Sequence, residues 1–139
     1  MPLYQRILVP LGDAGDAAVL EHVVQLAELA GAEIVLLRVA HYHTRDSKTA
    51  EVDESEALLS EIAARLAGGG LEVRTVVGHG EVVETILAQA AALECDLIAM
   101  ATHGRRLLTR GALGCVSEAI WRRSSIPVIT VRIANAADR

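Results

Sequence analysis

Residues 96–131 read DLIAMATHGRRLLTRGALGCVSEAIWRRSSIPVITV, and this stretch is the most informative part of the chain. An apolar run from Leu97 to Met100 predicts a buried strand that leads into His103-Gly104. A loop with three arginines follows, Gly114 opens a predicted helix, and Pro127 precedes a last apolar strand. Where a strand, a glycine-bounded loop and a helix start follow one another, backbone N–H groups and the helix dipole favour an anion. The stretch therefore predicts an α/β fold that carries a phosphate-binding loop.

The composition agrees with this class of fold and excludes several others. The chain has 139 residues, which fits a single domain, and 52% of them are apolar. It has no Phe and one Trp, so we expect a core of aliphatic residues, as in a parallel sheet covered by helices. The scarcity of aromatic side chains and the net charge of -5 argue against a nucleic-acid partner.

The chain also lacks the sequence signals of membrane insertion and secretion. No apolar run approaches the ~20 residues that a membrane span needs, and the N-terminus has no charged region followed by a long apolar one. Cys95 and Cys115 are isolated, which is typical of reduced thiols rather than of a disulfide or a zinc site. We therefore expect a cytoplasmic protein without a membrane partner.

Strand and helix patterns alternate along the whole chain. Apolar runs predict five strands, at residues 5–11, 34–39, 71–77, 97–100 and 127–133. The helical spacing of apolar residues predicts four helices, one capped by Asp16 and stopped by Gly31, and three at residues 58–66, 82–91 and 116–123. Residues 40–53 are polar and are interpreted as a mobile connection. Alternating strands and helices imply right-handed βαβ units and a parallel sheet.

The polarity of the strands predicts their order in the sheet. The first and second strands are the most apolar and belong in the centre, and residues 34–39 of the second are interpreted as one continuous apolar run. The third strand alternates apolar and polar residues, as an edge strand does. An open sheet in the order 3-2-1-4-5, with helices on both faces, satisfies both conditions. The strand order then reverses between the first and fourth strands, and ligands of open α/β sheets bind beyond the carboxyl ends of the strands at such a point. Residues 10–13 and 101–104 are therefore expected to border a ligand crevice.

Four blocks of the sequence resemble the universal stress protein family. They are ILVPL at residues 7–11, GAEIVLLRV at 31–39, DLIAMATHGR at 96–105 and GCVSEAIWRRSSIPVITVR at 114–132. The resemblance covers nearly the whole chain. It implies a Rossmann-like domain of the adenine nucleotide alpha hydrolase-like type, a role in the stress response and a homodimer. It also implies a division between members that bind ATP and members that do not.

The family's ATP signature is Gly, two residues, Gly, nine residues, Gly, and then Ser or Thr. The register here gives Ala101, Gly104, Gly114 and Cys115, so the two later glycines match. Ala101 adds a methyl group, Cys115 is a poorer hydrogen-bond donor than a hydroxyl, and Gly12 stands where the family usually carries Asp. The resemblance implies ATP or another adenine nucleotide as ligand, with Mg²⁺ as a candidate companion ion. The implied nucleotide-binding residues are Pro10, Leu11, Gly12, Asp13, Val39, Met100, Ala101, His103, Gly104, Arg105, Gly114, Cys115, Val116 and Ser117.

The last strand carries a separate prediction about assembly. Its apolar residues would form an uncovered sheet edge, and such an edge invites pairing with another chain across a two-fold axis. The resemblance implies the same dimer edge, at Val128, Ile129, Thr130 and Val131. Nucleotide binding would order the loop at residues 105–113 and so change a surface for a protein partner. Trp121 is expected in the core or in an interface.

Two other functions remain open at this point. One is a family member that has lost nucleotide binding and acts through dimerisation and protein contacts, as Ala101, Gly12 and Cys115 suggest. The other is a slow ATP hydrolase, for which Asp13 is the only reasonable metal partner. No catalytic residue and no metal site is assigned, because His103 is interpreted as a ribose or phosphate contact and the histidines of residues 40–53 as solvated loop residues.

Overall fold

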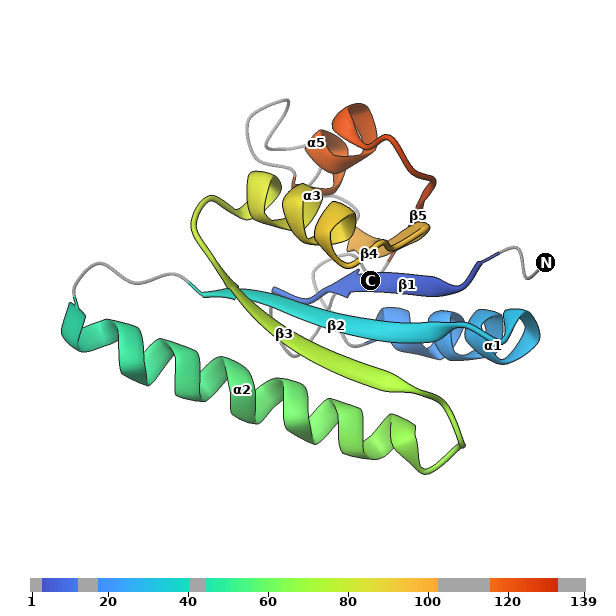
Figure 1. Cartoon of the computed structure of the whole chain (residues 1–139), viewed down its shortest axis with the longest axis horizontal. Coiled ribbons are helices and arrows are strands. Elements are labelled where there is room, and N and C mark those ends of the chain that lie inside the picture. The colour runs from blue at the N-terminus through green and yellow to red at the C-terminus, as the bar shows by residue number, and fades with distance from the viewer. Residues whose placement is uncertain (1–3, 13–17, 41–44, 103–115, 133–139) are drawn as a thin grey trace, which may run out of the picture.

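The computed structural model describes residues 4–12, 18–40, 45–102 and 116–132. Strands and helices alternate within them as predicted (Figure 1). In chain order the elements are β1 (Arg6–Pro10), α1 (Leu20–Ala30), β2 (Glu33–Ala40), α2 (Arg45–Ala67), β3 (Val73–His79), α3 (Val82–Ala92), β4 (Leu97–Thr102), α5 (Val116–Arg123) and β5 (Val128–Arg132). None of the helices in these parts of the chain has both the length and the apolar character that crossing a bilayer demands.

The five strands form one parallel sheet in the predicted order β3-β2-β1-β4-β5. The central strand β1 pairs with β2, where Ile7 lies opposite Ile34, and with β4, where Leu8 lies opposite Ile98. The chain therefore extends the sheet outward from β1 through β2 and β3, and then returns to the other side of β1 to add β4 and β5. This return places the reversal of strand order between β1 and β4.

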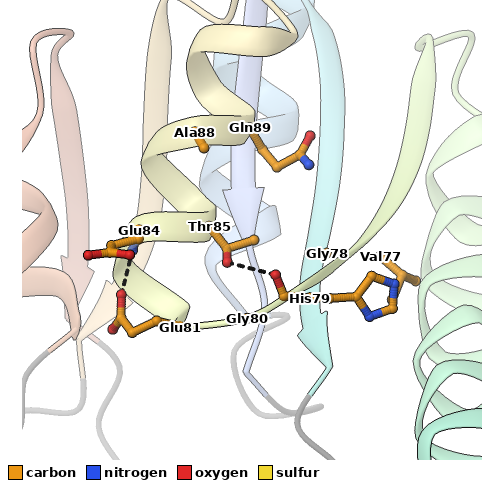
Figure 2. Close-up of a pocket in the computed structure, with 9 residues that line it drawn as sticks. All are labelled: Val77, Gly78, His79, Gly80, Glu81, Glu84, Thr85, Ala88 and Gln89. Atoms are coloured by element: carbon orange, nitrogen blue, oxygen red, sulfur yellow. Dashed lines mark hydrogen bonds between the residues drawn. The ribbon is translucent and has the colours of Figure 1, made fainter.

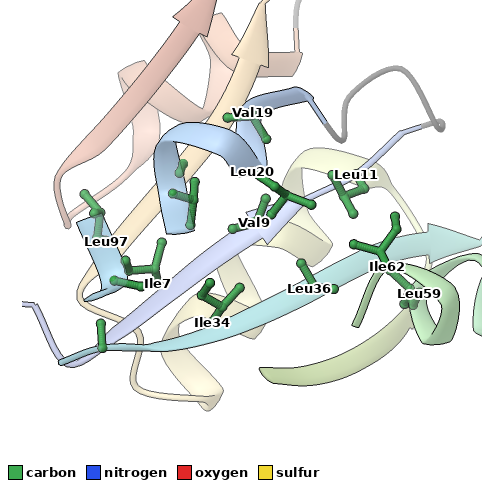
Figure 3. Packing of buried hydrophobic residues seen from close by; sticks show 14 residues of the cluster. Ile7, Val9, Leu11, Val19, Leu20, Ile34, Leu36, Leu59, Ile62 and Leu97 are labelled. Carbon is green, nitrogen blue, oxygen red and sulfur yellow. The ribbon is translucent and has the colours of Figure 1, made fainter. Parts of the chain in front are cut away.

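Helices cover both faces of the sheet, with α1 and α2 on one face and α3 and α5 on the other (Figure 1). Successive residues of a strand point to opposite faces, so Ile7 and Val9 enter the cluster beneath α1 and α2, whereas Leu8 enters the cluster beneath α3 and α5. Figure 3 shows the first of these clusters. Burial on both faces explains why the central strands are almost wholly apolar.

Local sequence explains two of the helix ends. α1 ends at Gly31, where φ is 70°, a left-handed conformation that glycine adopts without strain, and the predicted stop is confirmed. α3 begins after Glu81, whose carboxylate accepts hydrogen bonds from the backbone N–H groups of Val83 at 3.1 Å and Glu84 at 2.7 Å. The predicted cap of α1 by Asp16 lies outside the described residues.

One expectation from the sequence was wrong, and a second is reduced to one of its two alternatives. Residues 40–53 do not form a connection throughout, because α2 begins at Arg45. The segment 48–57, KTAEVDESEA, is rich in Lys, Ala and Glu, which favour helix even where no apolar stripe marks it, and the helix is held by packing along β2 and β3. Trp121 was expected in the core or in an interface; it is 65% exposed on α5, so it lies outside the core, and its place in an interface stays a prediction.

Candidate functional site

The candidate site lies at the carboxyl edge of the sheet, where β1 and β4 run side by side. β1 pairs with β2 on one flank and with β4 on the other, which is the predicted point of reversal. Beyond the last residue of β1, the Leu11 N–H still donates to the Leu37 carbonyl at 2.8 Å, and the chain then leaves the sheet at Gly12. Ligands of open α/β sheets bind beyond such a point, so this edge is where a site is to be sought.

The described residues that were predicted to bind nucleotide fall into two groups. The accessible group, in which Gly12 is exposed and the others are half-buried, comprises Gly12, Val39, Ala101 and Val116. The side chains of the second group are buried and belong to the core; they are Pro10, Leu11, Met100 and Ser117. The fold thus brings the ends of β1, β2 and β4 and the start of α5 to one edge, with part of their surface open.

The other predicted residues lie outside the described residues. They are Asp13, His103, Gly104, Arg105, Gly114 and Cys115. The glycine-bounded loop and the order that a ligand would impose on it therefore stay predictions. The same holds for the histidines at positions 41 and 43.

Two neighbouring residues of β2, Arg38 and Val39, point to opposite faces of the sheet at this edge. Val39 packs against the cluster beneath α3 and α5. Arg38 turns toward α2, where its Nε donates to the Ser55 hydroxyl at 3.0 Å, and its Nη1 donates to the Gly12 carbonyl. The sequence prediction counted residues 34–39 as one apolar run and so missed Arg38. A charged residue within a buried strand needs hydrogen-bond partners, and its presence in the run was the available signal.

A cavity of about 480 Å³ opens beside this edge, at the carboxyl end of β3 (Figure 2). It is lined by residues 77–81 and by Glu84, Thr85, Ala88 and Gln89 of α3. The Thr85 hydroxyl donates to the His79 carbonyl at 3.2 Å, while the His79 ring extends away from Thr85. None of the described residues that were predicted to bind nucleotide lines the cavity, but Gly78 lies in register with Val39.

The start of α3 does not offer a free anion site at this cavity. Both carboxylate oxygens of Glu81 accept N–H groups of the first turn, at Val83 and Glu84. A ligand anion would have to displace this carboxylate and approach the Glu84 side chain as well, since both residues line the cavity. The phosphate prediction therefore depends on α5 and the loop that precedes it, and not on α3.

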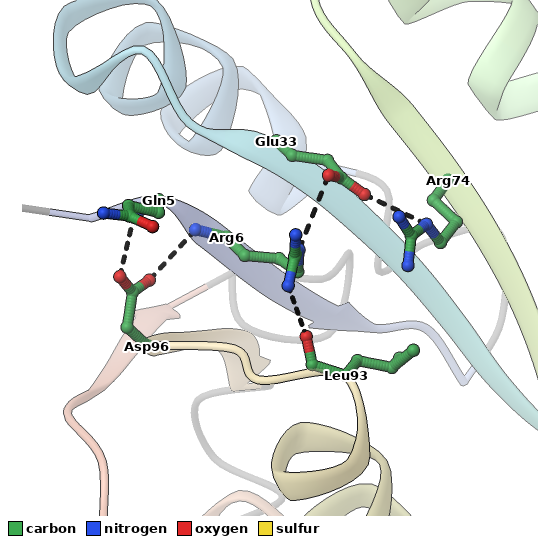
Figure 4. A network of polar contacts seen from close by, with 6 residues as sticks. All are labelled: Gln5, Arg6, Glu33, Arg74, Leu93 and Asp96. Atoms are coloured by element: carbon green, nitrogen blue, oxygen red, sulfur yellow. Dashed lines mark hydrogen bonds and ion pairs between the residues drawn. The ribbon is translucent and has the colours of Figure 1, made fainter. Parts of the chain in front are cut away.

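The opposite, amino edge of the sheet is closed by a polar network (Figure 4). The Asp96 carboxylate accepts the backbone N–H groups of Gln5 at 2.8 Å and Arg6 at 3.0 Å. The Arg6 guanidinium in turn donates to the Leu93 carbonyl at 2.6 Å and lies 3.4 Å from the Glu33 carboxylate. These contacts join the starts of β1, β2 and β4.

Two further residues at the amino edge are paired or buried. Arg74 of β3 lies 3.1 Å from the second carboxylate oxygen of Glu33. Cys95 is buried, and burial raises the pKa of its thiol from 9.0 to about 11, against the opposing effect of Arg6. Among the described residues, no group of three His, Cys, Asp or Glu side chains could hold a metal ion.

Sheet order and helix placement together define a Rossmann-like α/β protein. Residues 3–132 match the model of the universal stress protein family, and the chain belongs to this family. Universal stress protein MJ0577 of Methanocaldococcus jannaschii is 26% identical over 159 residues, which cover 96% of this chain and 98% of the relative. Universal stress protein Slr1230 of Synechocystis is 27% identical over 121 residues, which cover 87% of this chain but 40% of the relative. The chain therefore spans less than half the length of Slr1230.

Solved structures show the same fold. The structure of MJ0577 superposes with a TM-score of 0.76 at 28% identity and covers 96% of this chain and 99% of its own. A universal stress protein in complex with cAMP gives a TM-score of 0.77 at 23% identity, over 92% of this chain and 97% of its own. An Archaeoglobus fulgidus protein in complex with dAMP gives 0.69 at 20% identity, over 92% and 98%. An Arabidopsis thaliana protein with AMP bound gives 0.71 at 17% identity, over 96% and 94%.

Proposed function

We propose that this chain is an adenine-nucleotide-binding module of the stress response, acting in the cytoplasm. The observation that carries the proposal is the reversal of strand order between β1 and β4, with Gly12 exposed and Ala101 half-buried at the two strand ends. Proteins of the same fold have been solved with cAMP, dAMP and AMP, which directs the proposal to adenine nucleotides.

The proposed ligand would use different strands for its two ends. Val39 offers a half-buried apolar side chain on the α3 face, in register with a residue of the β3 cavity, which suits the apolar surface of a base. The loop from Gly104 to Gly114 and the N-terminus of α5 would hold the phosphates through backbone N–H groups and the helix dipole. ATP is the nucleotide that the sequence signature favours, and Mg²⁺ is a candidate companion ion.

Ala101 is the departure from the ATP signature that the structure bears on most directly. Its methyl group packs against the cluster beneath α1 and α2, whereas Val39 packs against the cluster on the opposite face. The extra methyl group is therefore directed into the protein rather than toward the face on which the base would lie. This packing supports a site that tolerates alanine at this position.

The first test is a calorimetric titration of nucleotide-free protein with Mg-ATP, ATP alone, AMP and adenosine. We expect binding of ATP that is weakened by Gly104→Val, because the side chain occupies space that the phosphates would need. Gly69→Val is the matched control. Gly69 lies in a surface turn, and a Cβ there meets its nearest atom at an ordinary 3.7 Å. Equal loss of binding in both variants, or no binding by the unaltered protein, would contradict the proposal.

A second candidate function is a family member that does not bind nucleotide. Gly12 at the family's usual Asp position favours it, because glycine offers no side chain there that could contact a nucleotide. Absence of heat and of thermal shift with any of the four ligands would favour this function. Ala101→Gly is then expected to create binding only if the methyl group is what closed the site.

We also propose that the protein forms a homodimer through β5. β5 is an edge strand of the sheet, and Ile129 on it is 38% exposed. Sedimentation velocity is expected to detect a dimer that dissociates in Ile129→Glu. Leu29→Glu is the control, since Leu29 is 88% exposed but lies on α1. A monomeric unaltered protein, or equal dissociation in both variants, would contradict this assembly.

A further inference from the structure

Arg38 forms a clamp across three elements at the carboxyl edge. The side chain leaves β2, donates from Nε to the Ser55 hydroxyl of α2 at 3.0 Å, and donates from Nη1 to the Gly12 carbonyl beyond β1. Ser55 is fully buried, at 0% exposure, and Arg38 is half-buried. A guanidinium in such a position is fixed on one side by the helix and can therefore fix what it contacts on the other.

The clamp contacts the chain at Gly12, one residue beyond the hydrogen bond from the Leu11 N–H to the Leu37 carbonyl. The last backbone ladder contact of β1 is the hydrogen bond from Leu11 to Leu37. Gly12 follows it, is exposed, and lacks a side chain that could restrict its conformation. A carbonyl and the amide that follows it form one planar unit, so a hydrogen bond to the Gly12 oxygen sets the direction in which the chain leaves the strand.

The direction of the clamp agrees with the face proposed for the base. Arg38 draws the Gly12 oxygen toward the face covered by α2, whereas Val39 and the β3 cavity lie on the α3 face. No carboxylate of the described residues pairs with Arg38, in contrast to Arg6 at the amino edge, which lies 3.4 Å from Glu33. The partners of Arg38 are a hydroxyl and a carbonyl, which suit orientation rather than charge neutralisation.

We propose that Arg38 is a positioning residue for the nucleotide site, which holds the end of β1 in the conformation that the ligand requires. This inference rests on the proposed adenine-nucleotide binding. Arg38 does not contact the ligand itself. It acts through Gly12, and Ser55 acts through Arg38.

The test compares Arg38→Met with Arg6→Met in the full chain. Each variant removes one half-buried guanidinium that donates to a backbone carbonyl, but at opposite edges of the sheet. We expect Arg38→Met to weaken binding of both adenosine and Mg-ATP by about tenfold, since the end of β1 would serve the part that the two ligands share. Arg6→Met is expected to lower the melting temperature while leaving both affinities within about twofold. Ser55→Ala, which keeps the guanidinium but frees its Nε, should weaken binding in the same sense and less.

The outcomes separate this inference from the proposed function. If the unaltered protein binds neither ligand, nucleotide binding is wrong and the role of Arg38 falls with it. If the unaltered protein binds and Arg38→Met binds equally well, nucleotide binding stands and the positioning role is wrong. If Arg38→Met does not fold, Ser55→Ala decides, and an affinity equal to that of the unaltered protein would overturn the inference.

Discussion

The two edges of the sheet are built from similar residues but in different ways. At the amino edge, the Asp96 carboxylate accepts the backbone N–H groups of Gln5 and Arg6, and the Arg6 side chain pairs with Glu33, so that the starts of three strands are joined. At the carboxyl edge, Arg38 makes the comparable contact to backbone, but Gly12 is exposed and a cavity opens beside the end of β3. Among the described residues, those of the amino edge are linked by ion pairs and hydrogen bonds, whereas those of the carboxyl edge include an exposed glycine and line a cavity.

The difference follows from the parallel direction of the strands. All five strands begin at one edge and end at the other, so each edge collects one kind of connection. A network at the amino edge can stabilise the fold without obstructing a ligand, because the reversal at the carboxyl edge is where a crevice forms. We therefore expect substitutions at the amino edge to change the free energy of unfolding and not nucleotide affinity, and the reverse for the clamp at Gly12.

Asp96→Ala is expected to have the largest effect on stability. The carboxylate accepts two backbone N–H groups, from Gln5 and Arg6, and both would lose their partner. Two hydrogen bonds to a charged acceptor suggest a loss of about 3 kcal/mol in the free energy of unfolding, measured by urea denaturation. Asp96→Asn keeps one acceptor oxygen and should lose about half as much. A weaker affinity for nucleotide in a folded Asp96→Ala would break the distinction between the edges.

Cys95 tests whether the amino edge is closed to solvent. Because burial raises the pKa of its thiol from 9.0 to about 11, its thiolate fraction at pH 8 should be about a hundredfold below that of an ordinary thiol. In a Cys115→Ser background, iodoacetamide should therefore alkylate Cys95 about a hundredfold more slowly in the folded protein than in urea. Similar rates in both conditions would show that this edge opens readily.

The same thiol gives a pH dependence of stability. The unfolded thiol ionises near its ordinary pKa of 9.0, whereas the folded thiol stays protonated up to about 11. Its contribution to stability is therefore complete below pH 9 and lost as the pH rises through 11. Comparison of urea denaturation at pH 8 and at higher pH for the unaltered protein and Cys95→Ala isolates this contribution, which should be absent from the variant.

The sheet could be predicted from the sequence because each buried face of a strand requires apolar residues at alternate positions. A strand covered on both faces is mostly apolar, whereas β3 alternates apolar and polar residues as a half-covered strand does, and this difference predicted the order. The start of α2 could not be predicted from apolar spacing, since its first turns are polar and are stabilised by helix propensity. The spacing of apolar residues reveals which helical turns are buried, and it misses helical turns that are exposed.

The candidate site was predictable only as a location. The reversal of strand order gave the edge, whereas the Arg38 contact to Gly12 joins residues 26 positions apart and depends on how β2 and α2 pack. The same is true of the bond from Gln5 to Asp96, across 91 positions. In the sequence, such a contact is visible only as a charged residue among apolar ones. The sequence does not show which residue is its partner.

Gly78→Ala asks how tightly the carboxyl edge is packed beside its cavity. A Cβ at Gly78 would lie 2.6 Å from Cγ2 of Thr85, so α3 or the Thr85 side chain would have to move. We expect a loss of about 2 kcal/mol in the free energy of unfolding. Thr85→Ser removes the methyl group and keeps the hydroxyl that donates to the His79 carbonyl, and the double variant should recover most of the loss. No recovery would place the cost in the backbone rather than in this contact.

Gly69→Ala is the control for that pair, because a Cβ there meets nothing closer than 3.7 Å. Its stability should stay close to that of the unaltered protein. If Gly78→Ala cost as much as Asp96→Ala, the carboxyl edge would be as important to folding as the amino edge, and the comparison would need revision.

Glu81→Ala is expected to change stability least, and it tests whether the start of α3 can bind an anion. Its carboxylate caps α3 through Val83 and Glu84, and loss of such a cap costs about 1 kcal/mol. Glu84→Ala is the matched control in the same turn, where only the favourable charge near the helix start is lost, about 0.3 kcal/mol. Since α3 is already capped by its own residue, neither variant should reduce nucleotide affinity. A gain in ATP affinity in Glu81→Ala alone would mean that the freed N–H groups of α3 can bind phosphate. The Glu81 carboxylate would then be what keeps phosphate from binding at α3 instead of at the loop before α5.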